Sequence, residues 1–369
     1  MESSFSLDYK EARERFVQAA AHAGATCDRR VCAARGPDGA ELSMDTAWLG
    51  EESAAGVLVT ISGTHGVEGF FGSAVQIEWL RRAAKQKLPA GIAVLHIHAL
   101  NPYGFAWLRR TNENNIDINR NWVDFGKPPE SSQLYEQIAD DLCPSDWSEA
   151  SQAQTRQRLN AWIANWGASG LAMYQKAVSE GQWKYPKGLF YGGRDISWSR
   201  QTLTDILQGS LRNAARVCVL DFHTGLGQFG YAEPIIGVPR SDARFQRAKS
   251  WIGAGLRSLF GDGSVSAEIK GDSLTALQGL LPHAQVDAIA LECGIKPVLE
   301  VEAALRAECW LHGYGDPLSA EGRHISERLR GVFHSDDPLW QGMALGQGLA
   351  ACQAAICELT PRASAVASR

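Results

Sequence analysis

A histidine and a glutamate three residues apart, His65 and Glu68, form the first pair in this sequence that could bind a metal ion. The H-x-x-[D/E] spacing is weak by itself, because the chain repeats it in polar segments at 324–327 and 334–337. Only the pair at 65 and 68 follows a predicted buried strand, at 56–62, and opens a predicted helix. Glycines frame this pair, so the backbone could turn tightly enough for both side chains to reach one ion.

The same glycines, spaced G-x-x-G-x-x-G, allow a second interpretation, which is a loop that cradles phosphate. The spacing fits neither G-x-G-x-x-G nor G-x-x-x-x-G-K, and no Lys-Ser or Lys-Thr pair follows it. A metal site is therefore the favoured hypothesis.

A third metal ligand is predicted at His223, which comes directly after the apolar run 217–222 and before a Thr-Gly turn. Two histidines and a glutamate suit one catalytic zinc ion and leave a fourth position for water. Asp221 would lie on the same side of the strand as His223 and could orient its ring, or it could cap the turn. His96 and His98 share a face of another strand, and we interpret them as hydrogen-bonded core residues, because no carboxylate adjoins them.

Glu292 lies near the end of the apolar run 288–293, where a buried strand would ordinarily carry another aliphatic residue. A buried carboxylate needs a partner, and water at a metal centre would provide one. In that position Glu292 would act as a general base and acid. The alternative is a glutamate that reaches solvent or a helix N-terminus.

The pattern D-x-N-R-N-W, which begins at Asp117, is the most specific in the chain. Asn119 and Arg120 place an amide beside a guanidinium, a combination suited to capturing a carboxylate. Upstream, Arg109 or Arg110 could stabilise the oxyanion that forms when water attacks a carbonyl group, and the spacing does not choose between them.

Short apolar runs alternate with helical segments, which predicts an α/β fold: a mixed, mostly parallel sheet with helices on both faces. The predicted strands are 40–49, 56–62, 93–100, 217–222, 233–238 and 288–293, and the predicted helices include 8–23, 70–86 and 341–358. Ligands collect at the ends of strands in such sheets, so His65, His223 and Glu292 are expected to converge there.

Residues 125–200 differ from the rest, because they are polar, helix-leaning and contain five tryptophans. We expect them to form a helical insertion that packs over the sheet and shapes the pocket, within a single hydrolase domain spanning 1–369.

Composition and charge narrow the classes of partner. The formal net charge is -5 and Lys and Arg do not cluster, so neither nucleic acid nor a membrane surface is an expected partner. The N-terminus lacks the apolar core of a signal peptide, which predicts a cytoplasmic protein. A serine esterase is disfavoured, because the chain has no G-x-S-x-G motif. The sequence predicts no particular oligomeric state.

The order of these motifs along the chain resembles that in the zinc carboxypeptidase superfamily. The motifs are H-x-x-E, N-P-x-G-F, an arginine, D-x-N-R-N, a strand-end histidine and a strand-end glutamate. The resemblance spans about residues 56–300. The D-F-H-T-G turn and the L-E-C-G strand end look more like the aspartoacylase and succinylglutamate desuccinylase branch, or a bacterial branch beside it, than like the digestive carboxypeptidases.

The resemblance implies roles for the residues that match its motifs. Zinc would be held by His65, Glu68 and His223. Glu292 would be the general base and acid, one of Arg109 and Arg110 would polarise the scissile carbonyl, and the substrate's carboxylate would be held by Asn119 and Arg120. The candidates for a tyrosine that closes over the substrate are Tyr191 and Tyr231.

The predicted activity is zinc-dependent hydrolysis of an amide bond adjacent to a free carboxylate, as in a carboxypeptidase-like peptidase. One alternative is an N-acyl amino acid deacylase, which would use the same machinery. Another is a non-catalytic protein that binds metal or peptide. The expected partner is accordingly a small peptide or an N-acyl amino acid.

Overall fold

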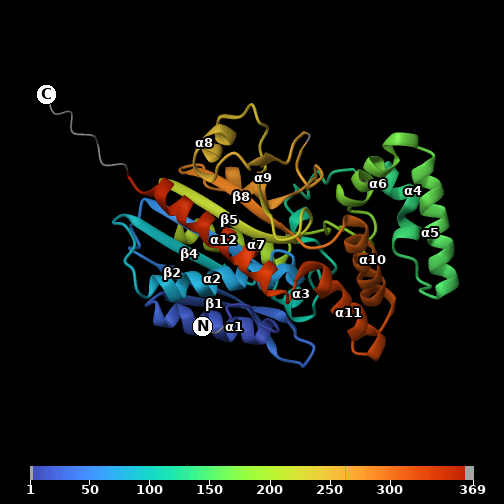
Figure 1. Cartoon of the computed structure of the whole chain (residues 1–369), viewed down its shortest axis with the longest axis horizontal. Helices are drawn as coiled ribbons and strands as arrows, with labels where there is room; N and C mark the ends of the chain where they lie inside the picture. The colour runs from blue at the N-terminus through green and yellow to red at the C-terminus, as the bar shows by residue number, and fades with distance from the viewer. Residues whose placement is uncertain (1–2, 131, 262, 362–369) are drawn as a thin grey trace.

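An eight-stranded sheet forms the centre of the computed structural model, which describes residues 3–130, 132–261 and 263–361 (Figure 1). The strands lie in the order β1-β2-β4-β3-β5-β8-β6-β7. Their bounds are β1 (Thr26–Arg35), β2 (Glu41–Leu49), β3 (Gly56–Ser62), β4 (Ile92–His98), β5 (Arg216–Gly225), β6 (Ala232–Ile236), β7 (Arg257–Ser258) and β8 (Gln285–Gly294).

The four central strands, β4, β3, β5 and β8, run parallel to one another. On one side β2 joins β4 antiparallel and β1 joins β2 antiparallel, while on the other side β6 joins β8 antiparallel. The predicted mixed, mostly parallel sheet is thereby confirmed. Strand β1 has no counterpart among the predicted strands, because it lies at the edge of the sheet and most of its residues are polar and exposed.

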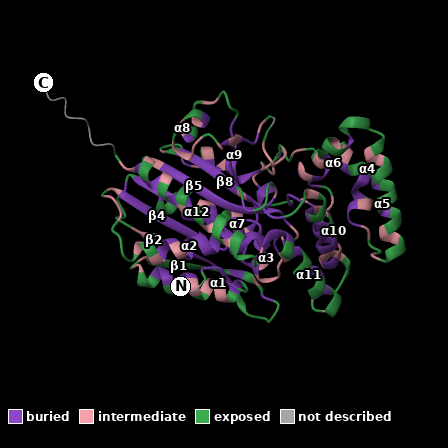
Figure 2. Cartoon of the chain, in the orientation of Figure 1, coloured by how far each residue is buried: buried purple, intermediate pink, exposed green. Residues whose placement is uncertain are grey.

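Helices cover both faces of the sheet, so β3 and β4 are buried along their whole length (Figure 2). One face packs against α1 (Tyr9–His22), α2 (Gly69–Ala83), α8 (Ala243–Ile252) and α12 (Pro338–Leu359). The other packs against α7 (Trp198–Ser210) and α9 (Ser273–Leu280). The prediction of helices on both faces of the sheet is therefore confirmed.

A third group of helices lies beyond one end of the sheet (Figure 1). It consists of α4 (Gln133–Leu142), α5 (Glu149–Ala164), α6 (Gly170–Ser179), α10 (Val298–Tyr314) and α11 (Ala320–Phe333). Apolar side chains from these helices share one hydrophobic cluster, separate from the clusters under the two sheet faces.

Helices α4 to α6 fall in the interval 125–200, whose role as an insertion in a single domain stays a prediction. Of the predicted domain, residues 1–2, 131, 262 and 362–369 lie outside the described part. Shorter elements are α3 (Pro102–Ala106), η1 (Gly66–Glu68), η2 (Ile118–Arg120) and η3 (Gly167–Ser169). Within the described residues, no helix has both the length and the apolar character needed to cross a membrane.

Candidate metal centre

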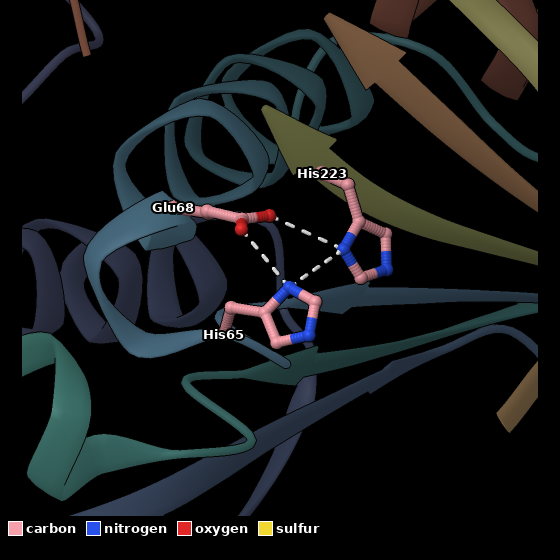
Figure 3. Close-up of side chains that lie close together, drawn as sticks. All are labelled: His65, Glu68 and His223. Atoms are coloured by element: carbon pink, nitrogen blue, oxygen red, sulfur yellow. Dashed lines mark hydrogen bonds and ion pairs between the residues drawn. The ribbon is translucent and has the colours of Figure 1, made fainter. Parts of the chain in front are cut away.

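Three side chains with metal-binding atoms meet beyond the carboxyl end of β3 (Figure 3). His65 Nδ1 lies 2.9 Å from Glu68 Oε1, and His223 Nδ1 lies 3.2 Å from Glu68 Oε2. The two Nδ1 atoms are 3.3 Å apart. One ligand atom from each residue can thus approach a single ion, because all three lie within 4.8 Å of one another.

The sheet and one close backbone contact bring these three residues together. Strand β5 pairs in parallel with β3 up to Ser62 and Phe222, so His223 emerges one residue beyond the end of β3. His65 precedes the η1 turn and Glu68 is its last residue, and η1 packs against α3. A Cβ atom at Gly66 would lie 2.0 Å from the carbonyl carbon of Gly104, so only glycine permits this approach.

A buried carboxylate lies behind each histidine ring. Asp221 Oδ2 is 3.0 Å from His223 Nε2, and Asp117 Oδ1 is 3.1 Å from His65 Nε2. Such partners fix ring orientation and turn the other nitrogen toward a metal. Asp221 has the orienting position inferred from strand alternation, whereas no role was predicted for Asp117 beyond membership of its motif. Two imidazoles and a glutamate, each imidazole backed by a carboxylate, fit the ligand set of a catalytic zinc site.

Glu292 lies directly beside the candidate metal ligands, because its position in β8 pairs with His223 in β5. Its Oε1 atom accepts a hydrogen bond of 3.0 Å from the backbone N–H of Leu226. Burial, together with the negative charge of Glu68, raises the pKa of Glu292 to about 7. The carboxyl group can therefore exchange a proton near neutral pH.

The two adjacent arginines have different surroundings. Arg110 lines the pocket, with Nη1 3.0 Å from Glu68 Oε1 and Nε 3.0 Å from Asp117 Oδ2. Arg109 points into the protein, where its Nε atom donates to Glu308 Oε1 at 2.7 Å. It is not among the described residues that line the pocket.

Asn119 and Arg120 also line the pocket, and both side chains are held in place. Asn119 Oδ1 accepts hydrogen bonds from the N–H and hydroxyl of Ser273, at 2.8 and 3.0 Å, so its Nδ2 group is the donor it can offer a ligand. Arg120 Nε and Nη2 both donate to the Ser179 carbonyl. Burial lowers the pKa of Arg120 to about 10, which leaves the guanidinium charged at neutral pH.

The two tyrosines lie elsewhere. Tyr191 packs among apolar residues under the sheet, and Tyr231 is 38% exposed; neither is among the described pocket-lining residues. Phe190 lines the pocket instead, with the guanidinium carbons of Arg110 and Arg120 each 5.1 Å from its ring centroid. Phe190 has a φ of +53°, rare for a residue with a side chain, and no sequence pattern indicates it.

His96 and His98 have the buried, hydrogen-bonded surroundings expected of core histidines. His96 Nδ1 lies 2.7 Å from the hydroxyl of Thr60, and His98 Nε2 lies 2.9 Å from that of Ser73. Both lie outside the set of described residues that line the pocket.

The pocket has a volume of about 1140 Å³ with its open mouth included, and two apolar walls flank the polar centre. We call one the β8 wall (Ile235, Leu259, Ile269, Leu274 and Ala290), which belongs to the cluster under α7 and α9. We call the other the α10 wall (Tyr174, Val178, Val301, Leu305 and Phe333), which belongs to the cluster of the third helical group.

Comparison with protein families gives one match, over residues 5–347, to a family described as "Protein of unknown function (DUF2817)". Sequence comparison with curated proteins gives no match.

Several solved structures are similar to this chain. The bovine thrombin-activatable fibrinolysis inhibitor, solved with a tick carboxypeptidase inhibitor, aligns over 97% of this chain and 98% of its own, with a TM-score of 0.51 and 9% identity. Carboxypeptidase A from Helicoverpa armigera aligns over 90% and 75%, with a TM-score of 0.49 and 13% identity. Succinylglutamate desuccinylase from Chromobacterium violaceum aligns over 87% and 74%, with a TM-score of 0.38 and 14% identity. The first of these alignments shows that the two chains share a fold over nearly their whole lengths.

Proposed function

Because the chain belongs to the DUF2817 family and folds like the metallocarboxypeptidases, we propose that it is a zinc hydrolase that cuts an amide bond adjacent to a free carboxylate. The observation that carries the proposal is convergence in one pocket. Metal-binding atoms, a buried carboxyl group beside them and an arginine-amide pair come from four separate segments of the chain.

Asn119 and Arg120 would bind the substrate's carboxylate. The fixed guanidinium supplies positive charge and the Nδ2 group of Asn119 supplies a neutral donor, a combination suited to a carboxylate. Asn119 contacts Ser273, the neighbour of Leu274 in the β8 wall. The side chain of the amine-bearing part of the substrate would then pack against that wall, which favours an apolar side chain such as leucine.

His65, Glu68 and His223 would hold the zinc ion, which when bound supplies a Lewis acid for the water and the scissile carbonyl. Glu292 would take the proton from the attacking water and return it to the leaving amine. Arg110 would stabilise the negative charge that develops on the carbonyl oxygen, because its guanidinium lines the pocket beside the metal ligands.

The first test replaces Glu292 with glutamine, which keeps the side chain's shape and removes its ability to accept a proton. We expect Glu292→Gln to retain one zinc per chain, measured by plasma mass spectrometry, while hydrolysis of N-acyl-leucine falls by about 100-fold to 10,000-fold. Full activity in this variant would exclude Glu292 as the base.

Carboxylate recognition is tested with paired substrates. N-acyl-leucine and Leu-Leu should be cut, and their C-terminally amidated counterparts should be cut far more slowly. The ratio of N-acyl-leucine to dipeptide hydrolysis separates a deacylase from a peptidase. A protein without tightly bound metal and with no activity on either substrate would be a binding protein, and the proposal would be abandoned.

A further inference from the structure

We propose that the substrate carries an aliphatic acyl chain on the carbonyl side of the scissile amide, and that the α10 wall binds this chain. The inference rests on the proposed function and names the part of the substrate that the polar centre leaves undefined.

The two walls differ in how they end. The β8 wall adjoins Asn119 through Ser273, and its five residues are all buried, so it encloses a side chain of limited length. The α10 wall adjoins the metal ligands, because the hydroxyl of Thr224, next to His223, donates to the Phe333 carbonyl at 2.6 Å. It also includes Val178, whose neighbour Ser179 accepts from Arg120. A substrate with its carboxylate at Asn119 and Arg120 and its carbonyl at the metal centre would therefore place a side chain of limited length on the buried wall and a longer acyl part along the α10 wall.

The α10 wall continues to the surface as an apolar rim. Leu171 on α6 and Leu299 on α10 line the mouth of the pocket, and they are 49% and 57% exposed. Scattered exposed leucines are common, but apolar side chains at the mouth of a pocket and continuous with its wall indicate a binding surface.

The polar groups along this path favour an acyl chain over a peptide. The hydroxyl of Tyr174 donates to the Glu302 carboxylate, so these two groups pair with each other across α6 and α10. A peptide on the α10 wall would bury backbone N–H and C=O groups against apolar side chains, at a cost in free energy. A hydrocarbon chain has no such groups, and each methylene removed from water contributes about 0.8 kcal/mol.

The experiment varies the acyl chain while the amine part stays leucine. N-acetyl-, N-butanoyl-, N-hexanoyl- and N-octanoyl-leucine are compared with N-succinyl-leucine and Leu-Leu. We expect kcat/KM to rise by about two- to fourfold per methylene, and so at least about 60-fold over the six methylenes from acetyl to octanoyl. Calorimetric titration of Glu292→Gln with the same compounds should show Kd falling in the same order, which reports binding apart from catalysis.

Substitutions at Leu171 and Leu299 test whether the acyl chain binds along the apolar rim. Leu171→Asp and Leu299→Asp should each lower kcat/KM for N-octanoyl-leucine about tenfold and change the value for N-acetyl-leucine less than about twofold. Leu318→Asp is the matched control, because Leu318 is 55% exposed and lies outside the pocket lining among the described residues. It should leave both substrates unaffected.

The outcomes separate the inference from the proposed function. Equal rates for all acyl lengths, a preference for the succinyl group, or faster cleavage of Leu-Leu than of N-octanoyl-leucine would overturn the acyl-chain inference and leave the hydrolase intact. Absence of hydrolysis for every compound by the zinc-loaded protein would overturn the proposed function, and the inference with it.

Discussion

Arg109 and Arg110 show how much the chemistry of one residue depends on the direction of its side chain. Both are arginines in the same loop, yet one is paired with Glu308 in the interior and the other reaches the pocket. The backbone before them turns through Leu108, whose φ is +52°. No sequence pattern predicts that turn. The spacing alone therefore could not show which of the two arginines reaches the pocket.

We predict that substituting Arg110 lowers activity, whereas substituting Arg109 lowers stability. Arg110→Gln should lower kcat/KM by about 100- to 1000-fold, because it removes a donor near the developing oxyanion. Arg109→Met should lower the free energy of unfolding by about 3–5 kcal/mol, because it leaves the Glu308 carboxylate buried without its partner. Urea unfolding and kinetics on the folded fraction measure the two effects.

The double variant Arg109→Met/Glu308→Leu is the control for this interpretation. Removing both charges should recover most of the lost stability, since an apolar pair avoids burying an unpaired charge. If the double variant is as unstable as Arg109→Met, the ion pair is not the cause.

At the scale of elements, the position of the η1 turn depends on the absence of a side chain at Gly66. The backbone of α3 lies so close that a methyl group at this position would overlap it. We predict that Gly66→Ala lowers the free energy of unfolding by about 1–3 kcal/mol or more. It should also weaken zinc binding, because η1 carries Glu68.

Gly209→Ala in α7 provides the matched substitution, because no atom of the described residues outside its own helix lies within 4 Å of an added Cβ. Its free energy of unfolding should stay unchanged or rise by up to about 1 kcal/mol. Equal effects of the two substitutions, measured by urea unfolding and zinc titration, would show that the contact at Gly66 is unimportant.

Elements differed in how well the sequence predicted them, for physical reasons. Strands β3, β4, β5 and β8 are buried on both faces, so each appears as an apolar run, and the residues after them could be placed at one edge of the sheet. Strand β1 is mostly exposed and lacks that signal. Residues 125–200, which include α6, were predicted to shape the pocket, but no pattern indicated that α10 and α11 would line it too. Which faces of these helices meet the pocket is set by packing between distant segments.

For the whole molecule, the buried histidines predict acid sensitivity. Burial lowers the pKa of His96 to about 3 and of His98 to about 4, whereas in the unfolded chain a histidine titrates near 6.5. Above pH 6.5 each neutral ring therefore makes its full contribution to the free energy of unfolding. That contribution is lost as the pH falls toward the pKa of the folded state. The loss should reach about 2 kcal/mol per residue at pH 5.

Urea unfolding at pH 7.5 and pH 5.0 measures this loss. His96→Gln removes one titrating group, so the variant should lose about 2 kcal/mol less than the wild-type protein between the two pH values. An identical pH dependence in the variant would mean that His96 does not contribute to acid unfolding.

The pairing of β3 with β5 has a consequence for the order in which the protein is made. His65 and Glu68 leave the ribosome early, whereas His223 follows only after the segments that form α4 to α7. Strand β8, which carries Glu292, comes later still, and α12, which covers β3 and β5, is the last described helix. A nascent chain therefore cannot bring the three side chains together until it has been synthesised past His223, and an ion held by all three could bind only after that point.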